Sequence, residues 1–460
     1  MKKLFPLLMV ILFLLAACAK QELVPQPEEP QKEQKEDPGE DPGEDPSEDP
    51  EDEPQQPETP RLREGRIPTI EITVPKNDYQ RLISYSKDTY ISGTIVFSDP
   101  DKWYTDTTQV SVSFQMKGRG NTSWNNPKKP FRLKLDQKRG VFGMKPNKDW
   151  VLIANYNDKS LLRNTLGYKV SRICKMAWTP KVRACDVYIN GSYEGSYLVV
   201  QHKEVAGEKV DIDVAAGDYY IEVETAECDF RIASSGPPIH FKDPTWADMG
   251  KTRQSEINNY LTQWWNAVQA DNFTKVFELM DTSSFVNYFI IEELAKNIDG
   301  NFRKSTFMTK ERDKKLILYH IWDFDIAFGN CDYMHSEFRP DSNGIYGDDP
   351  TGWYVKVVDE RARSNGLYQH LFKDPGFVEA VKTQWNKVYP ELSELPAWLE
   401  EEARINRDSY DRNFTRWKIL GQYVWPNPYP IPSDYDGELF SLSNFLTKRL
   451  LWMNTAINQL

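Results

Sequence analysis

Apolar and polar residues alternate along several short segments in the first half of the chain, after residue 65. Within residues 109–116, Val110, Val112, Phe114 and Met116 share one face, and the residues between them are polar. A period of two is typical of strands with one buried face. Together with short apolar runs, the pattern predicts a mixed sheet with strands over residues 67–74, 109–116, 131–135, 150–154, 187–189, 193–200 and 219–223.

Two local signals complete the prediction for this half. Asn190 and Gly191 stand between two apolar runs, which predicts a tight hairpin. Asp158 or Ser160 is a suitable N-cap for one intervening helix, whose apolar residues extend to Val170.

Helical spacing replaces alternation in the second half of the chain. Ser283 or Ser284 is a suitable N-cap for the helix over residues 285–296. Residues 330–365 and 421–438 are rich in Asp, Pro, Gly and Tyr, which is typical of loops. The predicted helices span residues 256–268, 274–280, 285–296, 377–389, 395–412 and 442–460.

The first 18 residues have the pattern of an export signal. Lys2 and Lys3 precede an apolar run over residues 4–15, which is too short for an ordinary transmembrane helix. The small residues that lead to Cys18 resemble a lipoprotein signal peptide. The resemblance implies that Cys18 is lipidated and anchors the chain to the cell envelope, at the outer membrane or the cell surface. The alternative is a plain secretory signal in which Cys18 is incidental.

Residues 19–65 are predicted to form a disordered acidic tether, rich in Pro and Gly. Residues 21–60 hold 16 Asp and Glu against two Lys, so this segment accounts for the net charge of −12. Such a segment repels itself and has little apolar area to bury. The body that follows is nearly neutral, which argues against a broad nucleic-acid surface and predicts no nucleic-acid partner.

The body contains four cysteines, none of them with the CxxC spacing of a zinc site. Cys174 and Cys185 are able to form a disulfide in an oxidising envelope. The alternative is that all four are buried free thiols. The four are Cys174, Cys185, Cys228 and Cys331.

Three acids flank a predicted hairpin whose strands are residues 305–309 and 316–322. Asp299 precedes the hairpin, and Asp323 and Asp325 follow it. A hairpin returns the chain to its start, so we expect these carboxylates to lie side by side. A divalent cation relieves their repulsion, and hard oxygen ligands beside a phosphate-bearing substrate suit Mg²⁺ or Mn²⁺. The alternative is that the three are ordinary turn residues.

A glycine-bearing loop in the first half offers a complement to these acids. Residues 118–123 read Gly-Arg-Gly-Asn-Thr-Ser, and the glycines let backbone N–H groups approach an anion closely. Cations near a polyphosphate neutralise its oxygens. The alternative is a solvated strand edge. The cations that follow the loop are Lys128, Lys129, Arg132 and Lys134.

Five segments together resemble the spore-coat CotH family of atypical secreted protein kinases. They occur in the order of the family and span most of residues 110–330. The segments are KGRGNTSWNNPKKPFRLKL (117–135), WVLIANYNDKSLLRNTLGY (150–168), VYINGSYEGSYLVVQ (187–201), NIDGNFRKSTFM (297–308) and IWDFDIAFGN (321–330).

The resemblance implies an α+β, two-lobed fold like that of an atypical protein kinase. The mixed or antiparallel sheet lobe is expected over residues 66–215, and the mainly helical lobe over residues 216–460. The resemblance also implies ATP, a divalent metal and phosphorylation of Ser or Thr in an unidentified protein acceptor. Asp299 matches the catalytic acid that orients or deprotonates the acceptor hydroxyl, and Asp323, with Asp325, matches the metal ligand.

The same resemblance implies a set of nucleotide-binding residues. Lys129 is the preferred lysine for nucleotide contact, and Arg163 and Asn164 match a helix motif that orients active-site groups. A cap or a buried polar bridge is the alternative for that pair. The full expected set is Arg119, Gly120, Ser123, Lys128, Lys129, Lys134, Arg163 and Asn164.

The chain departs from ordinary kinases at several positions, which keeps two other functions open. Lys304 stands where a second metal ligand is usual, and Gln201 stands where relatives often have Glu. A non-catalytic pseudokinase that binds glycan or protein through aromatic loops is one alternative, with Trp353-Tyr354 and residues 423–430 as candidates. A phosphotransferase for small molecules or glycans is the other.

Overall fold

The computed structural model describes residues 66–105, 109–233, 236–300, 302, 304–332, 348–356 and 366–460. These residues belong to one compact unit, Arg63–Leu460. The predicted signal peptide, the lipidated Cys18 and the acidic tether lie outside the described residues. Within the described residues, no helix is both long enough and apolar enough to cross a membrane.

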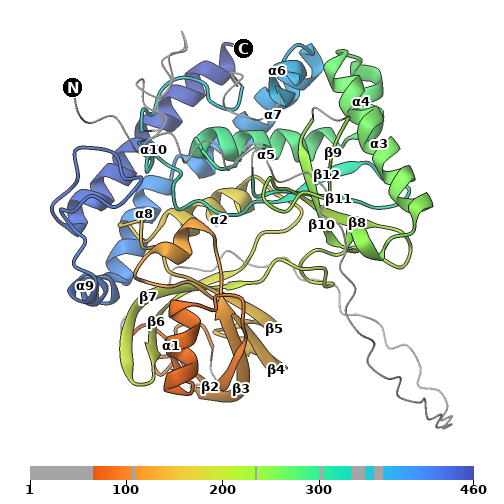
Figure 1. Ribbon diagram of the computed structural model, residues 1–460. Coiled ribbons are helices and arrows are strands. Elements are labelled where there is room, and N and C mark those ends of the chain that lie inside the picture. The colour runs from red at the N-terminus through yellow and green to blue at the C-terminus, as the bar shows by residue number, and fades with distance from the viewer. Residues whose placement is uncertain are drawn as a thin grey trace, which may run out of the picture. The chain divides into compact units, whose positions relative to one another are not determined.

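The alternating segments of the first half form a closed barrel of seven strands in the order β1-β2-β3-β4-β5-β7-β6 (Figure 1). Neighbouring strands pair antiparallel except β1 and β6, which pair parallel and close the barrel. The strands are β1 (Thr69–Thr73), β2 (Ile91–Ser98), β3 (Gln109–Gly118), β4 (Phe131–Val141), β5 (Met144–Ile153), β6 (Val182–Ile189) and β7 (Ser192–Gln201).

The sequence predicted the mixed pairing but not the closure of this sheet. Closure leaves no exposed edge, since β1 hydrogen-bonds on both sides. Alternate side chains such as Phe114, Met116, Leu133 and Trp150 fill the interior and are almost fully buried. Helix α1 (Lys76–Ser84) and strand β2 were not predicted.

A second sheet of five antiparallel strands has the order β12-β11-β8-β10-β9. Its last two strands in sequence, β11 and β12, are the predicted hairpin. Helix α2 (Arg163–Ile173), between β5 and β6, begins later than predicted. The strands are β8 (Tyr219–Val223), β9 (Phe230–Arg231), β10 (Pro238–Asp243), β11 (Thr306–Lys310) and β12 (Leu316–His320).

Helices cover the second sheet and continue to the C-terminus (Figure 1). The central helix, α5, is buried nearly all round and packs against β12, α2, α7 and α10. Asp281 caps it, in place of the predicted Ser283 or Ser284. The helices are α3 (Lys251–Gln269), α4 (Phe273–Leu279), α5 (Thr282–Ala295), α6 (Leu367–Leu371), α7 (Pro375–Leu392), α8 (Leu395–Ile405), α9 (Arg407–Arg416) and α10 (Tyr435–Asn458).

Two smaller expectations are also settled by the fold. The helix predicted over residues 395–412 is two helices, α8 and α9, which meet at Asn406. The four cysteines of the body are free thiols, and Cys174 and Cys185 are buried without a disulfide between them.

Candidate active site

One buried asparagine holds together the two loops that carry the predicted acids. Helix α5 ends at Ala295, and Lys296 turns the chain with a positive φ of 42°. The Nδ2 of Asn297 donates to the carbonyl oxygen of Asp323 at 3.3 Å. Its Oδ1 accepts the backbone N–H of Asp299, also at 3.3 Å. Asn297 therefore ties the loop before β11 to the loop after β12.

The structure brings Asp299, Asp323 and Asp325 close enough for their charges to interact. Burial raises the pKa of Asp323; the charge of Asp299 raises it further, and Arg119 lowers it. Burial and the charge of Asp323 hold the pKa of Asp325 well above its ordinary value. Asp323 also has a φ of 72°, a conformation that few non-glycine residues adopt. Asp323 and Asp325 therefore resist ionising together.

The donor set of this cluster fits a cation that arrives with a phosphate. Among the described residues, no three His, Cys, Asp or Glu side chains are arranged to hold a metal ion by themselves. Mg²⁺ commonly uses one or two carboxylates and takes its other ligands from water and substrate phosphates. Asp323 and Asp325 supply such a pair, and their mutual repulsion is what a bound cation would relieve.

The start of α2 positions the loop that carries Asp323. Asn164 Oδ1 accepts the backbone N–H of Phe324 at 2.9 Å. Arg163 Nε donates to the carbonyl oxygen of Ala327 at 3.1 Å, and its Nη1 donates to Asp158 Oδ1 at 2.7 Å. Both side chains are buried, and these contacts are with protein groups. The pair therefore orients the acidic loop, and direct nucleotide contact is a prediction that these contacts do not support.

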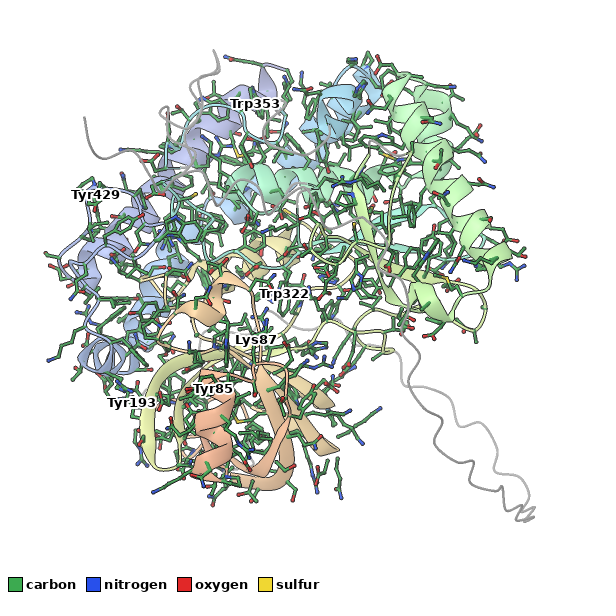
Figure 2. All side chains as sticks on the ribbon, in the orientation of Figure 1. Tyr85, Lys87, Tyr193, Trp322, Trp353 and Tyr429 are labelled. Carbon is green, nitrogen blue, oxygen red and sulfur yellow. The ribbon has the colours of Figure 1, made fainter. Side chains whose placement is uncertain are left out.

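The predicted glycine-bearing loop faces the acids from the barrel. The guanidinium of Arg119 lies 5.7 Å from the ring centre of Trp322, next to Asp323 in the chain. Gly120 has a φ of 80°, and a Cβ there would lie 2.1 Å from Ser123 Oγ, so this tight turn requires glycine. Lys87 Nζ donates to the carbonyl oxygen of Gly120 at 3.2 Å. Lys87 and Trp322 are labelled in Figure 2.

A cavity of about 200 Å³ opens beside this loop. Lys117, Arg119 and Arg132 line it together with His202, so cations outnumber the acids of its wall. Side-chain cations of this kind suit the oxygens of a phosphate chain.

A lysine–glutamate pair that the sequence did not predict lies beside the acids. Lys203 Nζ lies 3.1 Å from Glu222 Oε1, and Lys242 Nζ lies 3.1 Å from its Oε2. Lys203 also sits over the ring of Phe307 at 3.9 Å, and its charge acts on Asp323. Burial lowers the pKa of Lys203 to about 8, although Glu222 opposes that shift.

One sequence signal pointed to this pair. Glu222 is the single charged residue in the apolar strand over residues 219–223, and a buried charge requires a partner. We call the region formed by Asp299, Asp323, Asp325, Arg119 and Lys203 the acid cleft.

The lysines that follow the glycine-bearing loop lie elsewhere. Lys128 is buried between the barrel and α9, where its Nζ donates to Asn413 Oδ1 at 2.8 Å. Lys129 Nζ donates to the carbonyl oxygen of Trp124 at 2.7 Å. Lys134 is exposed on β4. The side chain of Lys128 is enclosed by protein, and nucleotide contact through Lys128, Lys129 or Lys134 remains a prediction without structural support.

A family sequence model matches the part of the chain that contains all residues of the acid cleft. The sequence model of the family described as CotH kinase protein matches residues 116–453, from β3 to α10. No curated protein matches the chain in sequence. The matched segment contains the glycine-bearing loop, the helix that orients the acidic loop and all three acids. With most of its length matched, the chain belongs to the CotH kinase protein family.

Proposed function

We propose that this protein is a kinase that transfers a phosphoryl group from ATP to Ser or Thr hydroxyls of a protein acceptor, with Mg²⁺ or Mn²⁺. The observation that carries the proposal is the acid cleft, in which three carboxylates face Arg119 and Lys203. In this proposal the barrel acts as the nucleotide-covering lobe, and the second sheet with its helices acts as the other lobe.

Each charged group of the acid cleft has a role in the proposed reaction. A bound divalent ion would neutralise charge on the phosphates, and Asp323 and Asp325 would hold it. Arg119 and Lys203 stabilise the remaining negative charge, a form of electrostatic preorganisation that costs no rearrangement during transfer. Asp299 orients the incoming hydroxyl and accepts its proton, as the catalytic-loop acid does in phosphoryl transfer.

The location of the activity is also a proposal. The lipoprotein-like start of the sequence supports an envelope protein that is anchored through a lipid on Cys18. ATP is scarce outside the cytoplasm, so the nucleotide is supplied locally or the acceptor is modified before export.

A transfer assay on the purified full chain tests the proposal. Labelled phosphate from ATP with Mn²⁺ should reach a casein-like protein in preference to a glycan. Asp323→Asn should abolish transfer, whereas Asp136→Asn, a matched change at an exposed acid on β4, should leave it unchanged. Absence of transfer by the unaltered chain, or equal transfer by Asp323→Asn, would contradict the proposed reaction.

Exposed aromatic residues favour surface binding as the second candidate function. Tyr423 and Tyr429 stack with ring centres 5.4 Å apart, and Trp425 between them is half exposed. The other predicted aromatic pair, Trp353 and Tyr354, is not available for surface binding. Tyr354 is buried, and Trp353 packs on Trp452 within the fold. A thermal shift with ATP and Mn²⁺ but no transfer to any acceptor would favour this pseudokinase function.

A further inference from the structure

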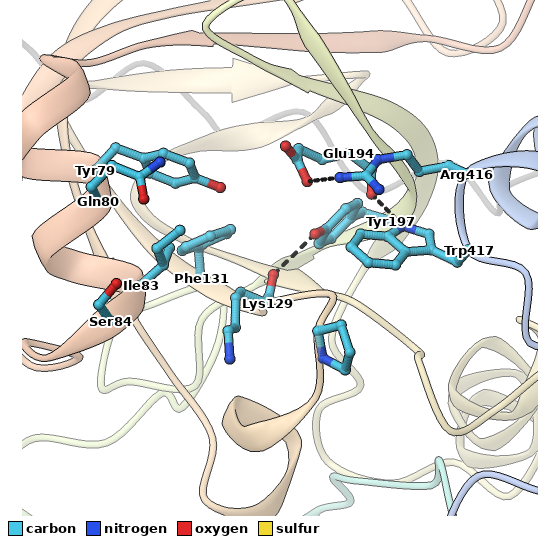
Figure 3. A pocket seen from close by; sticks show the side chains of 11 residues that line it. Tyr79, Gln80, Ile83, Ser84, Lys129, Phe131, Glu194, Tyr197, Arg416 and Trp417 are labelled. Atoms are coloured by element: carbon cyan, nitrogen blue, oxygen red, sulfur yellow. Dashed lines mark hydrogen bonds and ion pairs between the residues drawn. The ribbon is translucent and has the colours of Figure 1, made fainter.

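A second cavity, of about 340 Å³, lies where α1, β4, β7 and the end of α9 meet (Figure 3). Tyr79, Phe131, Tyr197 and Trp417 line it. We call this cavity the ring pocket. Ligand pockets usually measure about 300–1,000 Å³, so this volume suits a ligand with a single ring.

The aromatic walls are fixed in place by hydrogen bonds at their edges. Trp417 Nε1 donates to the carbonyl oxygen of Glu194 at 2.8 Å. The Tyr197 hydroxyl donates to the carbonyl oxygen of Lys129 at 3.0 Å. Figure 3 shows the Tyr79 hydroxyl directed toward the middle of the cavity. Phe131 and Tyr197 are almost fully buried, so Tyr79 and Trp417, which are half-buried, are the rings that a ligand with an apolar face and polar edges can reach.

Charged side chains flank these rings. Arg416 Nη2 lies 3.8 Å from Glu194 Oε2, so one carboxylate and one guanidinium share the same wall. Lys129 is a second cation at the cavity, and Glu194 is the single acid among the lining residues. Burial raises the pKa of Glu194, which Arg416 and Lys128 oppose. The local charge therefore favours an anionic ligand.

A cationic ligand would find the ring faces already taken. Arg416 lies over the ring of Trp417 at 4.3 Å, and Lys128 lies over the ring of Tyr197 at 4.6 Å. A cage for an ammonium group requires open ring faces, and here protein cations occupy two of them.

The ring pocket and the acid cleft are built from different residues. None of the residues that line the ring pocket belongs to the acid cleft or lines the cavity beside Arg119. A ligand in the ring pocket would therefore have no need of Asp323 or of nucleotide.

We propose that the ring pocket binds one ring of an acidic sugar, such as a uronic acid. The half-buried ring of Tyr79 contacts the apolar face of the sugar ring, and Arg416, which lies over Trp417, binds its carboxylate in the bidentate geometry that guanidinium favours. Glu194 and the Tyr79 hydroxyl bind the sugar hydroxyls. This inference goes beyond phosphoryl transfer and does not depend on it.

Isothermal titration calorimetry on the full chain tests the proposal with glucuronate, glucose and choline as probes. Glucuronate should bind saturably, glucose more weakly, and choline not at all. Arg416→Met and Trp417→Leu should each weaken glucuronate binding at least about tenfold. Arg407→Met is the matched control, since Arg407 is on the same helix and pairs with Asp411 and Asp436 instead.

The outcomes separate this site from the proposed kinase site. If Asp323→Asn binds glucuronate with unchanged affinity, the ring pocket is a site separate from the acid cleft. If Asp323→Asn loses glucuronate affinity, the proposal of a separate site is overturned. Absence of saturable binding, preference for choline, or unchanged affinity in a folded Arg416→Met variant would also overturn it. Circular dichroism melts of each variant establish that the fold is intact, and Tyr79→Phe, which removes one hydroxyl, should weaken binding without loss of structure.

Discussion

The acid cleft and the ring pocket are two sites of one fold, but they are supported in different ways. Buried hydrogen bonds from Asn164 and Asn297 fix the backbone on which Asp323 stands. The ring pocket is formed by side chains that meet from separate elements, with Trp417 and Arg416 at the end of α9. A site on a buried polar network should lose function sharply when one bond is removed. A site formed by side-chain packing should lose affinity in smaller steps.

The largest effect is expected at the catalytic acid of the acid cleft. Asp299→Asn keeps the shape of the side chain but removes the acceptor of the hydroxyl proton, so kcat should fall by about 10²–10⁴-fold. ATP affinity should change little, because Asp299 is proposed to serve the acceptor. Initial rates and ATP titrations on the same preparation measure both. Turnover close to that of the unaltered chain would remove Asp299 from the mechanism.

Loss of a positioning bond should have the next largest effect. Asn164→Leu keeps the branched shape of the side chain but removes the acceptor of the Phe324 N–H, so the loop with Asp323 should shift. We expect transfer to fall by about 10–100-fold, the usual cost of losing a residue that orients a metal ligand. The manganese concentration for half-maximal activity should rise in parallel. A purely structural role would lower the melting temperature without this change in manganese dependence.

The two regions also differ in how far the sequence predicted them. The sequence predicted that Asp299 and Asp323 lie close together, because a hairpin returns the chain to its start and these two acids flank the hairpin. The partnership of Lys203 with Glu222 joins the loop after β7 of the barrel to β8 of the second sheet, and no local pattern encodes which residue pairs with Glu222. Lys129 shows what a family pattern leaves open: the neighbouring Pro130 accepts the backbone N–H of Arg119, but Lys129 Nζ donates to Trp124, so its contact with nucleotide stays a prediction.

The barrel shows the same limit at the level of the fold. Alternation predicted most of its strands, because each has one buried face. Closure depends on parallel pairing between β1 and β6, which stand far apart in the sequence, and alternation carries no information on pairing partners. The ring pocket was not foreseen either, since its walls come from residues that range from Tyr79 to Trp417.

A smaller effect should appear in the pH dependence of nucleotide binding at the acid cleft. Burial lowers the pKa of Lys203 to about 8, so Lys203 is charged below that pH and neutral above it. If only the charged form binds phosphate, ATP affinity should weaken by at most about tenfold between pH 7 and pH 9, in proportion to the charged fraction. Titrations with ATP and Mn²⁺ at both pH values measure it. Lys203→Arg stays charged and should lose this dependence; a similar slope in that variant would assign it to another group.

The smallest effect concerns the buried lysine beneath the ring pocket, Lys128, and acts on stability. Burial lowers the pKa of Lys128 to about 7 in the fold, against 10.5 for the exposed group. Between these values the unfolded chain binds a proton that the folded chain does not, so stability should rise with pH, by at most about 1.4 kcal/mol per pH unit. Urea unfolding at pH 7, 8 and 9 should show this rise in the unaltered chain and a shallower one in Lys128→Met. Lys134→Met, at an exposed lysine of β4, should keep the full slope, and equal slopes in all three proteins would mean that Lys128 keeps its proton in the fold across this range.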